Sequence, residues 1–212
     1  MAVHFTGPIL YAGKDSPRKW FENLPTSCNP DYVLYMDDFT GVTLDNTNDW
    51  TVIKDSSASA ALGADVENEI FAVSSGRDIW FETKLFVTDA EGDAMDVCVG
   101  LTVNFATNPE AMLTAADRIV FQIDDGDSNI DCVTEKDGTA TTTDSGVDIS
   151  SGTYVTLGFH VKSTGSVEFF VNRNLVATHT DNIPDDENLA IGAMELSGSA
   201  TGTKSMSIDY LL

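Results

Sequence analysis

Basic side chains are scarce in this chain of 212 residues. Lysine and arginine total 11 against 34 aspartates and glutamates, which gives a formal net charge of −23. A surface this negative repels the phosphate backbone of nucleic acids and the anionic surface of membranes, so neither is an expected direct partner. The few basic residues are unevenly placed, because three of them accompany only two acidic residues within residues 1–30. A mildly basic segment therefore precedes a strongly acidic body.

Cysteine is also rare, with only Cys28, Cys98 and Cys132 and no CxxC spacing. An odd number of cysteines without a regular framework favours free thiols, a reducing compartment and no zinc site. Cys98 and Cys132 lie in apolar strand-like runs, where a small buried thiol is the ordinary interpretation. The first residues lack the basic-then-apolar pattern of a signal peptide. No run reaches about 18 apolar residues, so no membrane span is expected either.

The motifs of common enzyme classes are missing as well. We find no G-x-S-x-G, no HExxH, no P-loop and no GxGxxG after a strand. His4, His160 and His179 are far apart in the sequence, and none stands beside a motif serine or cysteine. A triad centred on His160 stays an alternative, but a surface or partner-facing histidine is the expectation. The sequence predicts a protein that is not an enzyme and needs no cofactor.

What the chain does contain is a period of two from residue 32 onward. Short runs with alternating apolar residues are separated by clusters of glycine, aspartate, asparagine and serine, which is typical of strands joined by turns. Ten such runs occur: YVLYMDDF, IWFETKLFV, MDVCVGLTV, RIVFQI, IDCVTE, YVTLGFHV, VEFFVN, LVATHT, LAIGAMEL and MSIDYLL. This spacing predicts an all-β, two-sheet antiparallel jelly-roll sandwich over residues 31–212. A single short helix is expected in NPEAMLTAADR, where Asn108 can cap the helix and Pro109 suits its first position.

Residues 1–30 form a separate segment in this interpretation. Four of the six prolines lie there, so neither a helix nor a strand ladder can continue for long. The segment nevertheless holds apolar residues without a regular period. It is either a strap packed on its own domain or an arm that binds another protein. The residues predicted to bind a partner are Ile9, Leu10, Tyr11, Arg18, Lys19, Trp20, Phe21 and Leu24.

The stretch FQIDDGDSNIDCVTEKDG, residues 121–138, is the best candidate for a metal loop. Both EF-hand registers fail, because the glycine and glutamate positions hold Ile130 and Lys136 in one register and Cys132 and Gly138 in the other. Aspartate, glycine and asparagine are also the residues that a hairpin turn requires. We therefore expect a hairpin between RIVFQI and IDCVTE, with a calcium site as the alternative. That site would use Asp124, Asp125 and Asp127.

Two further candidates concern carbohydrate. The run from Glu91 to Asp96 nearly matches the E-x-D-x-x-E pattern of laminarinase-type glycosidases, which have a jelly-roll fold. Its last acid is an aspartate, and Gly92 stands where a strand residue is needed, so the two-carboxylate requirement is poorly met. A sugar-stacking platform is the second candidate, although core packing is the favoured role for these rings. Its rings would come from Tyr32, Tyr35, Trp50, Trp80, Phe169 and Phe170.

Taken together, these segments resemble a known family. The GPILY and ENLP arm, PDYVLYMDDFTG, GRDIWFETKLFV, DRIVFQIDDGD and SVEFFVNRNLVATHT are similar to tailed-bacteriophage virion proteins with a concanavalin/laminin-G-like jelly roll. In the last hairpin, Asn172-Arg173-Asn174 replaces the usual Asp-Gly turn. The resemblance implies a capsid cement or decoration protein that anchors through residues 1–30 to the major capsid protein, on the outside of a virion assembled in the host cytoplasm.

The alternative is a carbohydrate-binding adhesion module, as a head fibre or in host recognition. The fold resemblance and Trp50 and Trp80 support this alternative. Possible partners are therefore the major capsid protein, a second copy of this chain, or glycans, and the resemblance brings no catalytic residues.

Overall fold

The computed structural model describes residues 50–54, 61–66, 71–88, 95–103, 109–197 and 204–211. For 50–54, 61–66, 109 and 197 it describes the backbone alone. The chain divides into two units, Met1–Tyr35 and Met36–Leu212. All the described residues belong to the second unit. The predicted arm, its eight partner-binding residues and the first predicted strand run lie outside the described residues.

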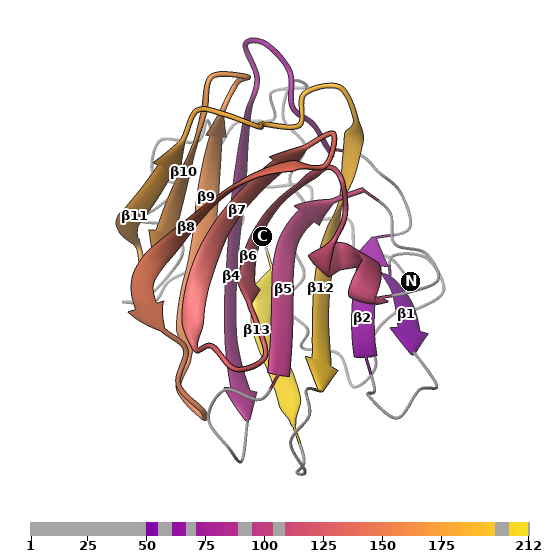
Figure 1. Ribbon diagram of the computed structural model, residues 1–212, viewed down its shortest axis with the longest axis vertical. Helices are drawn as coiled ribbons and strands as arrows, with labels where there is room; N and C mark the ends of the chain where they lie inside the picture. The colour runs from indigo at the N-terminus through magenta and orange to yellow at the C-terminus, as the bar shows by residue number, and fades with distance from the viewer. Residues whose placement is uncertain are drawn as a thin grey trace, which may run out of the picture. The chain divides into compact units, whose positions relative to one another are not determined.

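The described chain forms two antiparallel sheets that face each other (Figure 1). The larger has eight strands in the order β1-β2-β12-β5-β6-β7-β8, with β3 also paired to β12. Its strands are β1 (Trp50–Lys54), β2 (Ala61–Val66), β3 (Phe71–Ala72), β5 (Met95–Thr102), β6 (Arg118–Ile123), β7 (Asn129–Lys136), β8 (Thr139–Asp148) and β12 (Asn188–Ser197). The smaller sheet has the order β11-β10-β9-β4-β13. Its strands are β4 (Asp78–Thr88), β9 (Val155–Lys162), β10 (Ser166–Val171), β11 (Asn174–His179) and β13 (Ser205–Leu211). The predicted all-β sandwich is confirmed.

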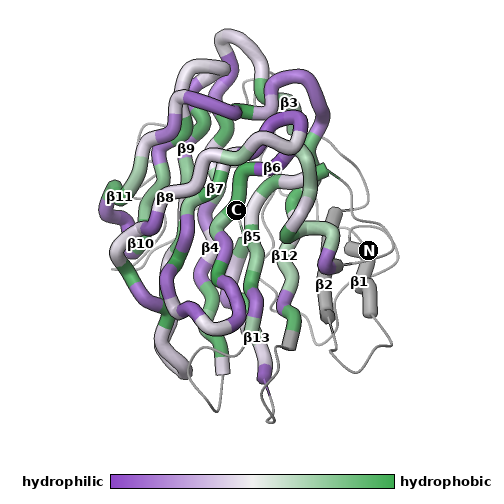
Figure 2. The backbone as a smooth tube through the Cα atoms, in the orientation of Figure 1, coloured by the Kyte–Doolittle hydropathy of each residue, from purple (hydrophilic) through white to green (hydrophobic). Residues whose placement is uncertain are grey.

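The period of two located most of these strands. Nine of the ten predicted runs are strands of the described chain, and only the run at residues 32–39 falls outside it. The prediction missed four strands, β1, β2, β3 and β8. The longest of them is β8, whose sequence TATTTDSGVD carries threonine in place of apolar residues. This strand lies at the edge of its sheet and is mostly exposed, so it needs few apolar side chains. Figure 2 shows the contrast between the mostly hydrophilic or neutral β8 and the hydrophobic β5, β9 and β12.

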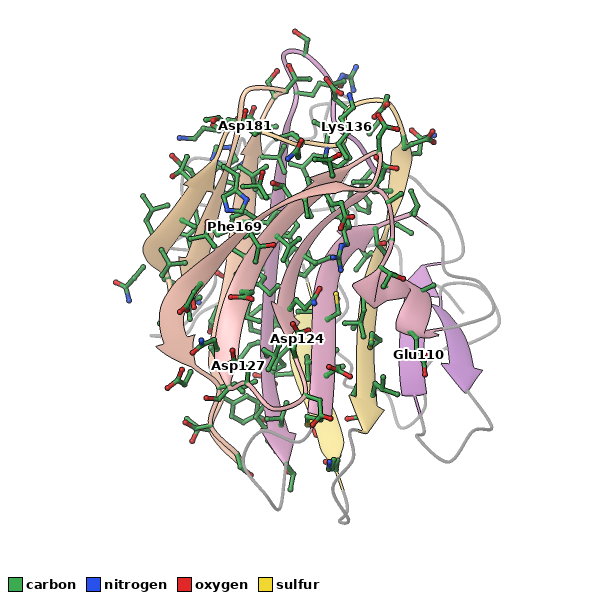
Figure 3. All side chains as sticks on the ribbon, in the orientation of Figure 1. Glu110, Asp124, Asp127, Lys136, Phe169 and Asp181 are labelled. Atoms are coloured by element: carbon green, nitrogen blue, oxygen red, sulfur yellow. The ribbon has the colours of Figure 1, made fainter. Side chains whose placement is uncertain are left out.

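Phenylalanine rings fill the space between the two sheets. Phe81 of β4 stacks on Phe159 of β9 with ring centroids 4.7 Å apart. Phe121 of β6, from the other sheet, meets Phe169 of β10 edge-on at 5.4 Å. All four side chains are at most 2% exposed. Aromatic packing of this kind combines a large buried area with favourable ring geometry, so it is a main source of stability for the sandwich. Figure 3 labels Phe169 in this position.

Each strand therefore has one side chain row in the core and one on an outer face. On β9, Leu157, Phe159 and Val161 are fully buried. On β4, Phe81 and Leu85 face the core, so Glu82, Lys84 and Phe86 share the outer face of the five-stranded sheet with Gly158 and His160 of β9. These two outer faces hold the candidate sites.

The predicted short helix is a 3-10 helix, η2 (Pro109–Leu113). It lies over the outer face of the eight-stranded sheet, where Met112 joins a buried cluster with Cys98, Val120, Val133 and Met194. Strands β5 and β6 approach closely at Gly100 of β5, where an added Cβ would lie 2.4 Å from the Ile119 carbonyl oxygen of β6. No helix in the described part of the chain is long and apolar enough to cross a membrane.

Candidate functional site

The acidic stretch is a β6–β7 hairpin, as predicted, and its carboxylates form turn contacts. Asp127 N–H donates to the Asp124 carbonyl oxygen at 2.9 Å, which closes the turn. The Asp127 carboxylate accepts a hydrogen bond from the Asn129 backbone N–H at 3.0 Å, and Asp124 accepts one from the Gln122 amide at 2.7 Å. Gly126 has φ of 89°, a conformation that glycine adopts without strain. Figure 3 shows Asp124 and Asp127 together near the end of this hairpin.

The described residues contain no cluster of side chains that would form the alternative calcium site. No group of three or more histidine, cysteine, aspartate or glutamate side chains there could hold a metal ion. Asp125 contributes its backbone N–H to Asp96 at 2.7 Å, across the gap between two strand ends. These contacts explain the local composition by turn chemistry.

Above the hairpin, the outer face of the eight-stranded sheet carries a row of polar side chains. We call Asp96, Gln122, Asp131, Glu135 and Asp144 the carboxylate face. The β-sheet register places Gln122 of β6 opposite Asp131 of β7, and Asp131 opposite Asp144 of β8. Directly opposed side chains on one face lie about 5 Å apart at Cβ, so the row brings like charges close together.

One cation balances part of this charge. Arg118 is 7% exposed, and its Nε donates to the Glu135 carboxylate at 2.7 Å. Its Nη1 donates to the Met112 carbonyl oxygen of η2 at 3.0 Å and to the Gln122 amide oxygen at 2.7 Å. Arg118 thereby fixes η2, Gln122 and Glu135 on one face, because a guanidinium holds several donors in a fixed plane.

Two other carboxylates of this face, Asp96 and Asp131, have raised pKa values. Burial raises the pKa of Asp96, and the nearby charges of Asp124 and Asp125 raise it further. Burial also raises the pKa of Asp131, and Asp144 and Asp124 add repulsion. A raised carboxyl pKa means that the carboxylate anion is less stable on this face than in water.

Among the described residues, the sequence candidates for catalysis lie apart from one another. Glu91 lies outside the described residues, and Asp96 is engaged with Asp125. His179 is buried between the sheets, where its Nδ1 lies 2.9 Å from Thr134 Oγ1 and its Nε2 lies 3.0 Å from Thr143 Oγ1. His160 stacks on Trp80 with ring centroids 3.5 Å apart. Nε2 of His160 lies 2.9 Å from the Asp78 carboxylate.

Burial lowers the pKa of both described histidines. For His179 only the charge of Asp181 opposes this effect of burial on the pKa. For His160 the Asp78 carboxylate opposes the lowering of the pKa by hydrogen bonding and charge, yet burial dominates. Both rings are therefore more readily neutral than a histidine in water.

An exposed aromatic ring with charged neighbours occurs on the outer face of the five-stranded sheet. Tyr154 is 47% exposed and immediately precedes β9. Its ring meets that of Phe86 at 71°, with centroids 4.7 Å apart. The Lys84 ammonium lies 4.5 Å from the Tyr154 ring centroid and pairs with the Asp209 carboxylate of β13 at 2.7 Å. We call these four residues the Tyr154 site.

The chain around Tyr154 is fixed locally. A turn places Thr153 N–H 3.1 Å from the Ser150 carbonyl oxygen, and Gly152 N–H donates to the Val87 carbonyl oxygen of β4 at 2.7 Å. Gly152 has φ of 69°, which this turn requires and which glycine tolerates. The Tyr154 ring is thus presented by a loop tied to β4, next to Lys84 on the same strand.

Glu82 comes two residues before Lys84 on β4 and lies on the same outer face, but it is 0% exposed. The Tyr210 hydroxyl of β13 donates to Glu82 Oε1 at 2.6 Å, and Arg173 Nη2 lies 3.5 Å from the same oxygen. Burial raises the pKa of Glu82 although Tyr210 and Arg173 both act to lower it. Burial likewise raises the pKa of Tyr210, with Glu82 adding to the effect. We call Glu82, Arg173 and Tyr210 the Glu82 cluster.

Arg173 reaches Glu82 from the turn of the β10–β11 hairpin. Asn172 and Arg173 have φ of 50° and 66°, so the turn uses two left-handed residues where the usual sequence has Asp-Gly. The register places Phe170 opposite Gly158 and Gly158 opposite Glu82. Because Gly158 has no side chain, the outer face leaves room at this point for the Arg173 side chain.

The predicted sugar-stacking platform is only partly tested. Phe169 is a core ring, as expected, whereas Trp80 and Phe170 lie half-buried on the outer face of the five-stranded sheet. The side chains of Trp50, Tyr32 and Tyr35 lie outside what the structure describes. Sequence reasoning missed Tyr154, Glu82 and Arg173 as functional candidates. The alternation in IWFETKLFV would have shown that Glu82 and Lys84 share a face, but not what contacts them.

Comparison with known proteins identifies the fold. No family model and no curated protein matches the sequence. Among solved structures, an endo-1,3-β-glucanase from Streptomyces sioyaensis has a TM-score of 0.61 at 13% identity, covering 84% of this chain and 94% of that one. The carbohydrate recognition domain of Emp46p, in a potassium-bound form, has a TM-score of 0.59 at 7% identity, covering 82% and 93%. SO2946 from Shewanella oneidensis MR-1, a protein of unknown function, has 0.58 at 16%, covering 95% of both chains.

These likenesses confirm the concanavalin-like jelly roll at the level of fold. At identities of 7% to 16%, no site residue of these proteins can be transferred to this chain, because one fold hosts many functions.

Proposed function

We propose that the chain is a carbohydrate-binding β-sandwich without catalytic activity, and that it holds a neutral glycan at the Tyr154 site. The observation that carries this proposal is the exposed Tyr154 ring beside the Lys84–Asp209 ion pair on one sheet face. A sugar ring has an apolar face of C–H groups and a rim of hydroxyl groups. The site offers a partner for each of these two surfaces.

The aromatic ring suits the C–H face of a sugar. Its π-system carries negative charge on the face, which attracts C–H groups, and stacking removes apolar area from water. The ring is already oriented by Phe86 and Lys84, so little conformational freedom is lost on binding.

The ion pair suits the hydroxyl rim. The Lys84 ammonium donates hydrogen bonds, and the Asp209 carboxylate accepts them. Hydrogen bonds to charged groups are stronger than those between neutral groups. Their side chains are 35% and 46% exposed, so both can reach a ligand in solvent. A net charge of −23 disfavours anionic sugars and leaves neutral ones as the preferred class.

The names of two structural neighbours support this choice of ligand. One is an endo-1,3-β-glucanase and another is a carbohydrate recognition domain. We therefore choose β-1,3-linked gluco-oligosaccharides as the first probes. The proposed absence of catalysis rests on the sequence, in which Asp96 replaces the final glutamate of the glycosidase pattern.

Calorimetric titration of the full chain with laminaritetraose tests the proposal. We expect a dissociation constant of about 1 mM, equivalent to about −4 kcal/mol, because the site is an open surface. Tyr154→Ala should weaken binding at least about tenfold by removing the stacking surface. Leu175→Ala is the matched control, since Leu175 is an exposed apolar residue of the same sheet that lies outside the Tyr154 site.

Two results would contradict the proposal. One is equal binding by the wild type and Tyr154→Ala, and the other is no binding at sugar concentrations well above about 1 mM. A reducing-end assay on the same mixtures tests the absence of hydrolysis, and release of new reducing ends would show that the chain is an enzyme.

The role of capsid cement protein, predicted from the resemblance, stays a prediction of the sequence. The location on the virion exterior and the major capsid protein as partner belong to the same prediction, as does self-association. Its support is the composition of residues 1–30, which are apolar, rich in proline and mildly basic. Counting copies of this chain per major capsid protein in purified virions tests it. A ratio near one supports cement, and absence from virions contradicts it.

A further inference from the structure

The Glu82 cluster contains two buried atoms that have no hydrogen-bond partner. Within the described part of the chain, four buried side-chain atoms are in this position, and two of them belong to one ion pair, Glu82 Oε2 and Arg173 Nε. One of these atoms is an acceptor and the other is a donor. Leaving a buried donor or acceptor unpaired is costly, so such atoms in a native structure call for an explanation.

The two atoms are free because other contacts occupy the rest of each group. Tyr210 donates to Glu82 Oε1 at 2.6 Å, which leaves Oε2 as the unpaired oxygen. Arg173 directs Nη2 to the same Oε1, which leaves Nε unpaired. The Glu82 side chain is 0% exposed, whereas the Arg173 side chain is 29% exposed at a hairpin turn. Arg173 is therefore the member of the pair that solvent reaches.

We propose that Glu82 Oε2 and Arg173 Nε form a seat for one hydroxyl group of a bound sugar. The proposal rests on the proposed function and names the residues that select between sugars. A hydroxyl group donates one hydrogen bond and accepts others, so a single hydroxyl satisfies both atoms. A cation is opposed by Arg173, and an anion is opposed by Glu82 and by the net charge of −23.

The seat lies in line with the Tyr154 site. Phe86, Lys84 and Glu82 are alternate residues of β4 on one outer face. Four residues of a strand cover about 13 Å, so the seat and the Tyr154 ring are separated by more than one sugar ring. An oligosaccharide lying along β4 would stack on Tyr154, pass Lys84 and Asp209, and place a hydroxyl group at Glu82. A monosaccharide would reach only one of the two places.

Hydroxyl selectivity tests the seat. Laminaritetraose and four analogues, each lacking one hydroxyl group on the terminal ring, are titrated into the full chain. We expect one analogue to bind at least about tenfold more weakly than the parent sugar, which is the factor that a hydrogen bond to a charged group contributes. Glu82→Gln should narrow the difference between the parent and that analogue, because the sugar hydroxyl loses a charged acceptor and the amide nitrogen can only donate to it. Leu175→Ala again serves as the control and should keep the selectivity.

A second measurement needs no variant. In the wild type, the Arg173 Nε–H resonance is followed by NMR while laminaritetraose is added. We expect this resonance to shift with the sugar and to stay in place with the analogue that binds weakly. A resonance that does not move with any sugar, and that shows contact with a bound water molecule, would mean that the cluster holds a buried water only. That result would overturn the seat, as would unchanged selectivity in Glu82→Gln.

The outcomes separate the seat from the proposed function. If the sugar binds and Tyr154→Ala abolishes binding while Arg173 is unaffected, the seat is wrong and the proposed function stands. If Arg173 responds selectively while Tyr154→Ala binds normally, the seat is right and the Tyr154 site is wrong. If neither the calorimetric signal nor the Arg173 resonance changes with any sugar, both are wrong.

Discussion

Replacing Asp131 by asparagine should stabilise the protein. Asp131 lies directly opposite Asp144 on the outer face of the eight-stranded sheet. Its pKa is raised by burial and by the charges of Asp144, Asp124 and Asp127. We choose Asp131 because Asp144 accepts a hydrogen bond from Gly146 N–H at 2.7 Å, which a substitution there would disturb. Asparagine keeps the shape of the side chain and removes the charge.

The magnitude follows from the geometry of the pair. Like charges directly opposite on one sheet face cost about 0.2–1 kcal/mol, and solvent screens the exposed Asp144. We therefore expect Asp131→Asn to raise the free energy of unfolding by about 0.5–1 kcal/mol at low salt. The assay is urea denaturation, because guanidinium chloride would itself screen the repulsion. The control Glu187→Gln removes one exposed charge from the loop before β12 and should change stability by less than about 0.5 kcal/mol.

Salt and pH give two further checks on the same substitution. At about 1 M salt the screening length falls to about 3 Å, so the gain from Asp131→Asn should largely vanish. Because the folded-state pKa of Asp131 is above its unfolded value, the wild type should recover part of the lost stability as the pH falls through these values. A variant that is less stable than the wild type at low salt would show that repulsion between Asp131 and Asp144 does not destabilise the sheet. A gain that salt leaves unchanged would likewise show that this repulsion is not the cause.

Three other predictions concern the body of the sandwich. Gly100→Ala should destabilise by at least about 2 kcal/mol in urea denaturation, because an added Cβ meets the Ile119 backbone at 2.4 Å and φ is 148°; a loss below about 0.5 kcal/mol would contradict the close approach. Since burial lowers the folded-state pKa of His179, stability should fall as the pH drops below about 6.5, and His179→Gln should flatten that slope; a variant with the wild-type slope would contradict this. Burial raises the pKa of the Cys98 and Cys132 thiols to about 12, so both should resist alkylation at neutral pH until urea unfolds the chain, and fast labelling in the folded state would contradict their burial.

Much of the fold follows from local pattern. Alternating apolar residues located β4, β9 and β10, because burying one face of a strand imposes a period of two. The hairpins at residues 121–138 and at Asn172-Arg173 were also predictable, since turn residues are selected by local backbone conformation. Strand β8 was not predicted, because an exposed edge strand needs no alternation of apolar residues.

The candidate site was far less predictable. The hairpin turn in the acidic stretch was expected, and a backbone hydrogen bond from Asp127 to Asp124 closes it. Glu82 and Arg173 lie in different hairpins, and their contact depends on the pairing order β10-β9-β4 and on Gly158. Tyr154 is the first residue of a predicted strand, where a ring is usually buried, and only the tertiary structure shows its exposure. Local sequence pattern predicts the strands, whereas the contacts of the site depend on how strands distant in the sequence pair.

Mapping of sugar binding onto individual residues tests the central claim most directly. The backbone amide resonances of the wild type are assigned and followed while laminaritetraose is added at millimolar concentration. We expect shifts at Lys84, Phe86 and Tyr154, on the outer face of the five-stranded sheet. Shifts confined to Gln122 and Asp131 on the carboxylate face, or no shifts at any residue, would contradict this expectation.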